Sequence, residues 1–244
     1  MKTKAKEKTI EERTTVTFHR SQHEHEALFE RGQLEAVTLF CGEDETRIGL
    51  TGVHVEVGQK TIAVAMDGVF MGVFESGVKQ DPGPVGRVLL TRDFLRSITA
   101  LHKSLYKDTS NVIALRWSGE KPSMVVVEFV APNATVINAR GYCTLEVQYT
   151  DWRAIVPDGN VAHTVPASVL TLSAERVAVL AKVAKLLGGA SRIVQLFASD
   201  GAGTAVQVRV VAIPGFFAVI MQCDTDEDPQ REFESVRKYF RGEP

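Results

Sequence analysis

Apolar positions with helical spacing occur at three places along the chain, and several short strand-like segments follow each of them. The three predicted helices span residues 21–40, 91–107 and 173–187. Predicted strands at residues 14–18 and 87–90 lead into the first and second helix. This order predicts three similar units, each with an optional leading strand, a helix and a set of strands.

The segments after each helix are rich in β-branched and aromatic residues, or alternate between apolar and polar residues, as β-strands do. Few helices and many strands in this order predict an α+β protein with antiparallel sheets. Two unrelated α+β domains with an accidentally similar order are the second possibility. The predicted strands lie at residues 47–57, 61–74, 111–117, 123–130, 134–140, 143–149, 192–198, 205–213 and 216–222.

Charge and helix-breaking residues divide the chain into segments. Residues 1–13 are dense in charge and poor in large apolar side chains, so we expect a disordered tail. The segment GVKQDPGPVG, with two prolines and three glycines, separates the first two units. We therefore predict a domain over residues 14–157, a half-size domain over 158–226 and a C-terminal helix or tail over 227–244.

One side of the second predicted helix is basic. At about 100° per residue its four cationic side chains fall within roughly 60° of one face. Such a row suits a surface that follows a phosphate backbone, although a merely solvated helix face is an equal alternative. The cations are Arg92, Arg96, Lys103 and Lys107, and the apolar residues on the other side are Phe94, Leu95, Ile98, Leu101 and Leu105.

The third predicted helix repeats this polarity more weakly, with Lys182 and Lys185 facing away from its apolar side. The first does not, because four glutamates make it acidic and would repel phosphate. Those glutamates are Glu24, Glu26, Glu30 and Glu35. The predicted DNA-binding residues therefore belong to the second and third helices only.

Composition limits the classes of protein that remain. The 244 residues have a formal net charge of -2, so any contact with nucleic acid must come from a local patch. No apolar run reaches the roughly 20 residues that span a bilayer, and no signal-like segment follows the N-terminus. We expect a cytoplasmic protein without a membrane partner.

Residues for metal, cofactor or catalytic chemistry are sparse. Cys41, Cys143 and Cys223 lack CxxC spacing and are expected to be reduced thiols. The histidines of HRSQHEHE, His19, His23 and His25, could hold a metal, but a polar helix start is favoured because no HExxH context is present. The glycine-rich residues 198–206 lack the lysine of a phosphate-binding loop and predict a hairpin turn. We predict no cofactor, no metal and no enzyme.

Two motifs go beyond periodicity. Residues 44–74 resemble the D-V-R-y-x-L-x-G … L-x-x-V-A-T-D-G-H-R-L-A pattern of the bacterial DNA polymerase sliding clamp (β-subunit) family. The matching positions are Arg47, Leu50-Thr51-Gly52 and Ala65-Met66-Asp67-Gly68, while Val69-Phe70-Met71 replaces the family's His-Arg-Leu. The edge that carries this replacement should be more apolar than in the family.

The second motif is YTDWRAIVP, residues 149–157, which resembles the family's F-P-D-Y-R-R-V-I-P signature at the end of its middle domain. The positions in register are Tyr149, Asp151, Trp152, Arg153 and Pro157. The resemblance covers residues 15–157 well, whereas residues 164–223 are similar only to the closing half of a clamp's last domain. It implies a DNA-clamp fold of about one and a half domains.

The resemblance also implies a function without catalysis. Such a protein encircles double-stranded DNA, lines the hole with positive helices and tethers DNA polymerase or other clamp-binding proteins; a clamp loader is a further possible partner. Short peptides with aliphatic and aromatic anchors dock in an apolar pocket between two domains. If about a dozen half-units close a ring, four copies of this chain would supply them.

By position in the family, the pocket residues are Leu50, Met66, Gly68, Val69, Phe70, Met71, Pro157, Val219, Ile220 and Met221. For Leu50, Val219 and Ile220 a place in the core is an equal alternative. Thioethers beside an aromatic ring, as at Met66 and Met71 next to Phe70, suit a surface that accepts varied apolar anchors.

Two other functions remain as hypotheses. A protein-interaction module or clamp regulator on the same fold would not encircle DNA. The acidic first helix favours it, as does the count of about three half-units, where a two-domain clamp would have four. A hydrolase of nucleotides or nucleic acid would rest only on scattered carboxylates such as Asp67 and Asp151. Because Asp-Gly most simply makes a turn, the hydrolase is the weakest of the three hypotheses.

Overall fold

Three units recur in the computed structural model, which describes residues 23–106, 112–120, 122, 124–130, 137–142, 151–156, 172–188, 194–198, 205–210 and 213–221. The first unit contains β1 (His25–Glu30), α1 (Arg31–Val37), η1 (Thr38–Phe40), η2 (Ile48–Leu50), β2 (Gly52–Val57), β3 (Ile62–Met66) and β4 (Phe70–Glu75). The second contains β5 (Gly86–Thr91), α2 (Arg92–Leu105), β6 (Val112–Trp117), β7 (Met124–Val130) and β8 (Ile137–Tyr142), followed by η3 (Trp152–Ile155). The described part of the third contains α3 (Ala174–Leu186), β9 (Val194–Ala198), β10 (Ala205–Val210) and β11 (Phe216–Met221).

The first two units exchange their leading strands. β1 of the first unit pairs with β6 of the second, and β5 of the second pairs with β2 of the first. The register is the same in both pairs, because the residue that caps each helix lies opposite the first residue of the strand, Glu30 opposite Val112 and Thr91 opposite Gly52. This reciprocity is that of a two-fold axis between the two units.

Two antiparallel sheets result, a four-stranded sheet in the order β1-β6-β7-β8 and a seven-stranded sheet in the order β5-β2-β3-β4-β11-β10-β9. The third unit joins the first through β11, which pairs with β4 from Phe216 opposite Phe74 to Ile220 opposite Phe70. The architecture confirms the predicted α+β class with antiparallel sheets.

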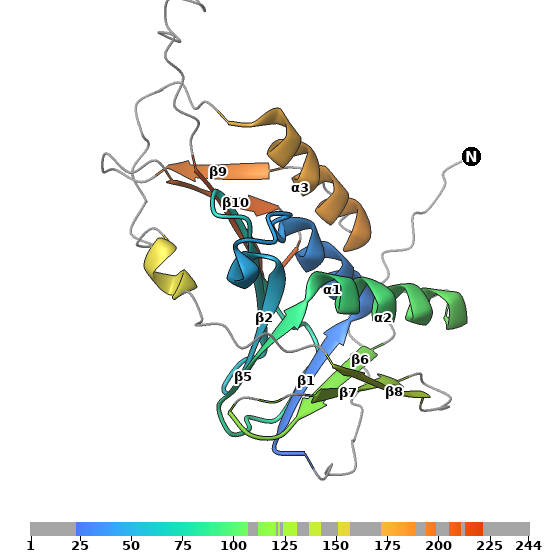
Figure 1. Ribbon diagram of the computed structural model, residues 1–244. Helices are drawn as coiled ribbons and strands as arrows, with labels where there is room; N and C mark the ends of the chain where they lie inside the picture. The colour runs from blue at the N-terminus through green and yellow to red at the C-terminus, as the bar shows by residue number, and fades with distance from the viewer. Residues whose placement is uncertain are drawn as a thin grey trace, which may run out of the picture.

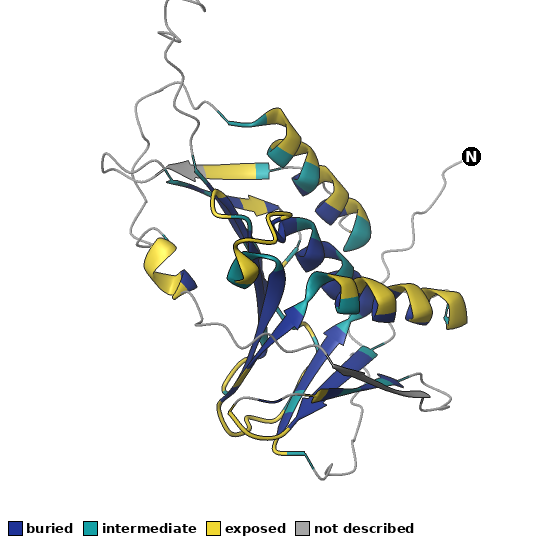
Figure 2. Cartoon of the chain, in the orientation of Figure 1, coloured by how far each residue is buried: buried dark blue, intermediate teal, exposed yellow. Residues whose placement is uncertain are grey.

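The helices lie together on one side of the sheets, with α1 between α2 and α3 (Figure 1). Contact between α1 and α3 is close, because a Cβ atom at Gly32 would lie 2.9 Å from the carbonyl oxygen of Leu186. The main core fills the space between helices and sheets, where Phe40 contacts the rings of Phe70, Phe74 and Phe216. Figure 2 shows the consequence: α1 and the central strands are buried, whereas α2 and α3 each expose a long side.

The start of the first unit differs from the sequence prediction of a helix over residues 21–40. Residues 25–30 form strand β1, and the helix covers only Arg31–Val37 before η1 ends at Phe40. Alternation decides this, because Ala27 and Phe29 are fully buried in the sheet while Glu26 pairs with Arg116 of β6. β1 therefore takes the place that was predicted for residues 14–18, which lie outside the described residues, as do the tail 1–13, residues 143–149 and the segment 227–244.

Candidate functional site

Helix α2 forms as its sequence predicts. The Thr91 hydroxyl accepts a hydrogen bond from the backbone N–H of Phe94, 3.2 Å away, and so caps the first turn. Leu95, Ile98 and His102 follow at helical spacing and are buried against the core. Thr99 completes this core face.

The outer sides of α2 carry the predicted cations, with one change. Arg96 and Lys103 are exposed, and Lys107 lies outside the described residues. Arg92 is turned toward the protein: its side chain is 21 % exposed, and a guanidinium nitrogen lies 3.4 Å from both the Gly42 carbonyl and the Glu43 carboxylate. Within α2, Arg96 and Lys103 are therefore the cations best placed to meet a ligand.

Two residues of α2 that were predicted to face the core do not. Leu101 and Leu105 are 42 % and 46 % exposed. They lie roughly 100° round the helix from the centre of the core face, so they border that face rather than belong to it.

Helix α3 presents Lys182 and Lys185 to solvent, as predicted, while Leu180, Val183 and Ala184 are buried beneath it. Near the start of α3, Arg176 forms an ion pair of 2.9 Å with Asp67 in the turn between β3 and β4. α2 and α3 therefore place four exposed cations in the helix layer.

Helix α1 does not present the acidic face that was predicted. Of the four glutamates, only Glu35 lies on α1, where its carboxylate is 3.7 Å from Arg31. Glu26 belongs to β1 and Glu30 caps the helix, since residues 25–30 are a strand and not a helix. Almost all of α1 is buried between its neighbours, so it contributes no acidic surface between α2 and α3.

Cys41 is a buried thiol beneath the start of α2. Burial raises its pKa to about 12, against the smaller lowering effect of Arg92 and Arg96. The thiol is therefore protonated and inert at neutral pH. In the described part of the chain, no three His, Cys, Asp or Glu side chains gather as a metal site would require, and His25 stacks on Trp117 inside the sheet.

A second apolar cluster lies on the opposite face of the seven-stranded sheet, and we call it the outer apolar surface. Its six members are themselves buried, each at most 6 % exposed, and partly buried side chains such as Leu50 and Phe217 pack against them: Val64, Met66, Met71, Val73, Trp152 and Val219. Three of the predicted pocket residues meet here, since Met71 of β4 lies directly opposite Val219 of β11 and Met66 opposite Met71. Leu50 packs against the edge of this surface.

The other predicted pocket residues divide between two places. Phe70 and Ile220 point to the opposite face and belong to the main core, which for Ile220 is the alternative that the sequence left open. The cause is the two-residue period of a strand, which turns neighbours to opposite faces. Gly68, Val69 and Met221 lie at the β3–β4 turn, where Val69 is 41 % exposed and its carbonyl accepts from the backbone N–H of Met221. Pro157 is outside the described residues.

The motif around Trp152 is fixed to the outer apolar surface by one buried carboxylate. Glu56 of β2 accepts hydrogen bonds from the Trp152 indole at 3.4 Å and from the Arg153 guanidinium at 2.7 Å. The Arg153 guanidinium also lies over the indole ring, 4.2 Å from its centroid. Sequence reasoning missed Glu56, although a charged residue inside the apolar strand GVHVEV was a signal.

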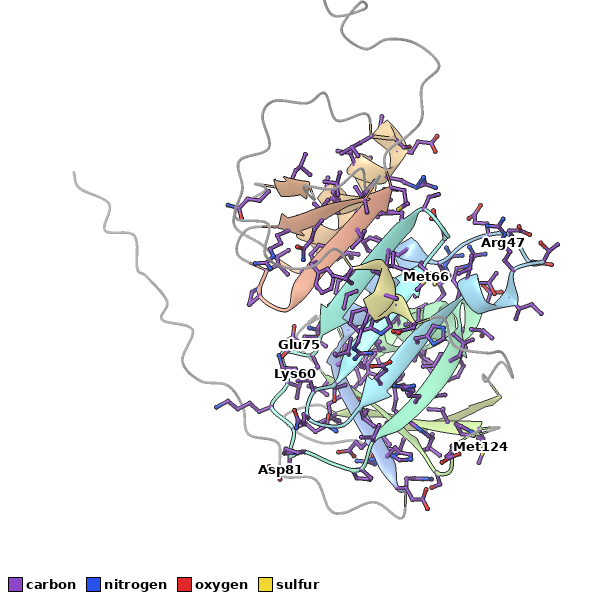
Figure 3. All side chains as sticks on the ribbon, turned by 90° about the vertical axis from the view of Figure 1, so that its left-hand side faces the viewer. Arg47, Lys60, Met66, Glu75, Asp81 and Met124 are labelled. Atoms are coloured by element: carbon purple, nitrogen blue, oxygen red, sulfur yellow. The ribbon has the colours of Figure 1, made fainter. Side chains whose placement is uncertain are left out.

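An apolar groove extends from the outer apolar surface toward β9 and β10. Ile62, Val73, Trp152 and Phe217 line it on one side, and Arg209 lies on its other side. Figure 3 looks onto this outer face, where η3 covers the sheet and Met66 lies beside it. The sequence prediction did not include the groove, because Ile62 is not one of the matched positions of the first motif and Phe217 lies outside both motifs.

The Asp67-Gly68 pair makes the predicted turn. The Asp67 carboxylate accepts from the backbone N–H groups of Val69 and Phe70 at 2.9 and 2.7 Å, and Gly68 has a φ of 101°, which suits glycine. With its remaining oxygen Asp67 holds Arg176 of the third unit. These contacts are those of a structural carboxylate.

The same arrangement of units occurs in solved bacterial clamps. The DNA polymerase III subunit β from Pseudomonas aeruginosa is 11 % identical, with a TM-score of 0.58 over 86 % of this chain and 69 % of that one. The chain has the fold of a bacterial DNA sliding clamp. The Bacillus subtilis clamp (13 % identity, TM-score 0.59, 87 % and 67 % of the two chains) and the C. crescentus β clamp (16 %, 0.60, 87 % and 69 %) agree.

The likeness to these clamps is one of fold, at 11–16 % identity. No protein-family model and no curated protein sequence matches the chain. Among the described residues, no helix has both the length and the apolar character to cross a membrane. The exposed cations of α2 and α3 and the outer apolar surface lie on opposite sides of the seven-stranded sheet (Figure 1).

Proposed function

We propose that this chain is a DNA sliding-clamp-like processivity factor, which encircles duplex DNA and tethers a polymerase or another replication or repair protein. The observation that carries the proposal is the placing of four exposed cations on α2 and α3, the two helices that flank α1 in a clamp fold. Arg96 and Lys103 of α2 and Lys182 and Lys185 of α3 would contact phosphate groups without reading sequence. The role requires no catalytic group.

Ring closure requires several copies. We propose that the first two units form a domain that ends at residue 157 and that the third forms a half-size domain. Four copies of the chain would then supply twelve units. Under this division, the pairing of β4 with β11, five residue pairs in antiparallel register, would be the join between the two domains. We propose that β8, an edge strand of the four-stranded sheet, makes the equivalent join between copies.

Encirclement predicts that retention on DNA depends on topology. The protein is bound to closed circular plasmid at low salt, the salt is raised to screen surface contacts, and the bound fraction is measured by gel filtration. We expect protein to remain on circles and to leave once a restriction enzyme opens them, since a ring slides off an end. Equal loss from circular and linear DNA would count against encirclement and favour the alternative below.

The outer apolar surface is the proposed peptide-binding site, at the join between β4 and β11. A fluorescent peptide with leucine and phenylalanine anchors is titrated against Leu50→Ala, at the edge beside the β3–β4 turn, and Phe217→Ala, in the groove. Loss of an anchor contact typically costs more than ~1 kcal/mol, so we expect at least a fivefold weaker affinity for one of the two variants. Val85→Ala is the matched control, because Val85 is 76 % exposed in the loop before β5.

The outcome also locates the peptide. A loss confined to Leu50→Ala places it at the turn, and a loss confined to Phe217→Ala places it in the groove. Unchanged affinity in both variants would remove this surface as the binding site.

A clamp-fold interaction module that does not encircle DNA is the second candidate. The pairing of Arg92 with Glu43 favours it, because it reduces the positive surface of the helix layer. This candidate predicts peptide binding that persists without retention on circular DNA.

A further inference from the structure

The third unit leaves exposed a side of its helix that the other two units bury. Each helix follows a capping residue, Glu30, Thr91 or Ser173, so equivalent positions can be counted from the cap. Four residues after the cap, Leu34 and Leu95 are both 0 % exposed, whereas Val177 is 43 % exposed. An apolar side chain at a core position is therefore uncovered in the third unit alone.

The next turn of the helices shows the same contrast. Eight residues after the cap, Thr38 and Thr99 are 6 % and 4 % exposed, whereas Ala181 is exposed. Val177 and Ala181 are four residues apart and so lie one above the other on the same side of α3. The uncovered region is thus a continuous strip along the helix.

The first strand after α3 is uncovered as well. Leu196 of β9 lies opposite Val208 of β10 in the register, and Val208 is fully buried in the main core. Leu196 shares that core-facing side, yet it is 46 % exposed. In the other units the core-facing residues of the corresponding strands, such as Val55 of β2 and Leu115 of β6, are 0 % exposed.

Exchange of leading strands explains the difference. β2 is covered at its edge by β5 and β6 by β1, in each case a strand supplied by the partner unit together with the helix that follows it. In the described part of the chain, β9 pairs only with β10. Among the described residues, no partner unit covers Val177, Ala181 and Leu196 in this way.

We infer that the third unit of a second copy covers this strip, about a two-fold axis, and that the two third units together complete one domain. We call the strip of Val177, Ala181 and Leu196 the seam. A second copy fits because units of this shape already cover one another reciprocally within the chain, with the same register on both sides. Lys182 lies about 100° further round α3 than Ala181, so closing the seam leaves it exposed, whereas Lys185 follows Ala181 by four residues and borders the seam.

The seam gives each copy two different joins, third unit to third unit and second unit to second unit through β8. Twelve equivalent units round a ring, three from each chain, satisfy this pattern with two perpendicular two-fold axes. One axis passes through the completed domain and the other between two domains. The pairing of third units does not depend on DNA, and only closure into a ring of four rests on the proposed function.

Association of the full chain, without DNA or peptide, tests the seam by sedimentation over a wide range of protein concentration. Val177→Asp and Leu196→Asp leave the monomer folded, because both side chains are already half exposed, but bury an unpaired charge in the seam. We expect each to weaken association by ~100-fold or more. The matched control is Val85→Asp, an exposed position away from the seam, and circular dichroism verifies folding.

Hydrogen exchange tests whether β9 is covered by a second copy of the protein or by segments of the same chain. We expect the backbone amides of β9 to become protected as concentration rises, with the effect absent in Leu196→Asp. Wild-type protein that stays monomeric, seam variants that associate like wild type, or β9 protected equally at all concentrations by the chain's own segments would each overturn the inference. Retention on circular DNA in any of these cases would leave the proposed function intact and remove only the seam.

Discussion

Reversing the four exposed cations of α2 and α3 should reduce affinity for duplex DNA by roughly three orders of magnitude at low salt. The substitutions are Arg96→Glu, Lys103→Glu, Lys182→Glu and Lys185→Glu. Each lost phosphate contact removes the release of a condensed counterion, and each glutamate adds repulsion. Because the side chains lie on the outer sides of helices whose core faces are untouched, the fold should remain intact.

The salt dependence makes this prediction specific. Affinity for a fluorescent duplex is measured over a series of salt concentrations, and the slope of log affinity against log salt should fall by about 0.9 for each phosphate contact that is lost. A control variant reverses four exposed cations elsewhere, so that the net charge is the same. Those positions are Arg47, Lys60, Lys79 and Arg209.

If the control weakens binding as much as the helix variant, the effect is one of net charge and the helices are not the DNA surface. If neither changes the slope, DNA contact through the described helices is excluded. The interaction-module alternative would then be the better account of this clamp fold.

Acidification from pH 7 to pH 5 should cost the folded protein about 4 kcal/mol through two buried histidines, about 2 kcal/mol each. Burial lowers the pKa of His54 from 6.5 to about 4, with smaller opposing effects from a Gly49 backbone hydrogen bond and Glu56 and a small further lowering from Arg87. Burial also lowers the pKa of His102 to about 4, and the Arg31 charge adds to this effect.

The direction follows from where the protons bind. Between pH 6.5 and pH 4 the unfolded chain takes up protons on these imidazoles and the folded chain does not. The contribution of these two neutral histidines to the free energy of unfolding is therefore fully present above pH 6.5 and is lost as the pH falls toward 4. Urea unfolding at pH 7 and at pH 5 measures the difference.

His102→Leu isolates half of the effect. His102 is fully buried against Tyr106 and Phe129, and neither ring nitrogen has a hydrogen-bond partner among the described residues. The leucine variant should lose only about 2 kcal/mol between the same two pH values, and should be at least as stable as wild type at pH 7. A variant that retains the full decline would show that His102 does not titrate in this window.

Much of the local structure could be predicted from the residues themselves. Thr91 as a cap and the spacing of Leu95 and Ile98 place α2 within a residue or two of its observed ends, and Asp67-Gly68 places the β3–β4 turn. The cap, the helical spacing and the turn are short-range features, which act on neighbouring residues. That Met66, Met71 and Val219 meet was expected only from their positions in the clamp family, with a place in the core as the alternative for Val219.

Other features depended on which surfaces meet. Residues 25–30 were predicted as part of a helix, but they pair with β6 and bury Ala27 and Phe29 in a sheet. Leu101 and Leu105 were predicted to face the core, but they border the core face of α2 and are exposed. Phe70 and Ile220 carry the same apolar signal as Met71 and Val219, but strand alternation turns them to the main core. Composition alone does not separate the two faces of a sheet that is covered on both sides.

The sequence by itself determined that three units of like order exist, where α2 and α3 begin, and that these two helices are basic. Only the tertiary structure decided that the first two units exchange leading strands and that, within the described residues, β9 of the third unit pairs with β10 alone. The pairs of residues involved lie far apart in the chain, as Glu26 and Arg116 do, so no local pattern records them. Their register is selected only when both sheets bury one common core, because a shift by one residue would turn every buried side chain to the wrong face.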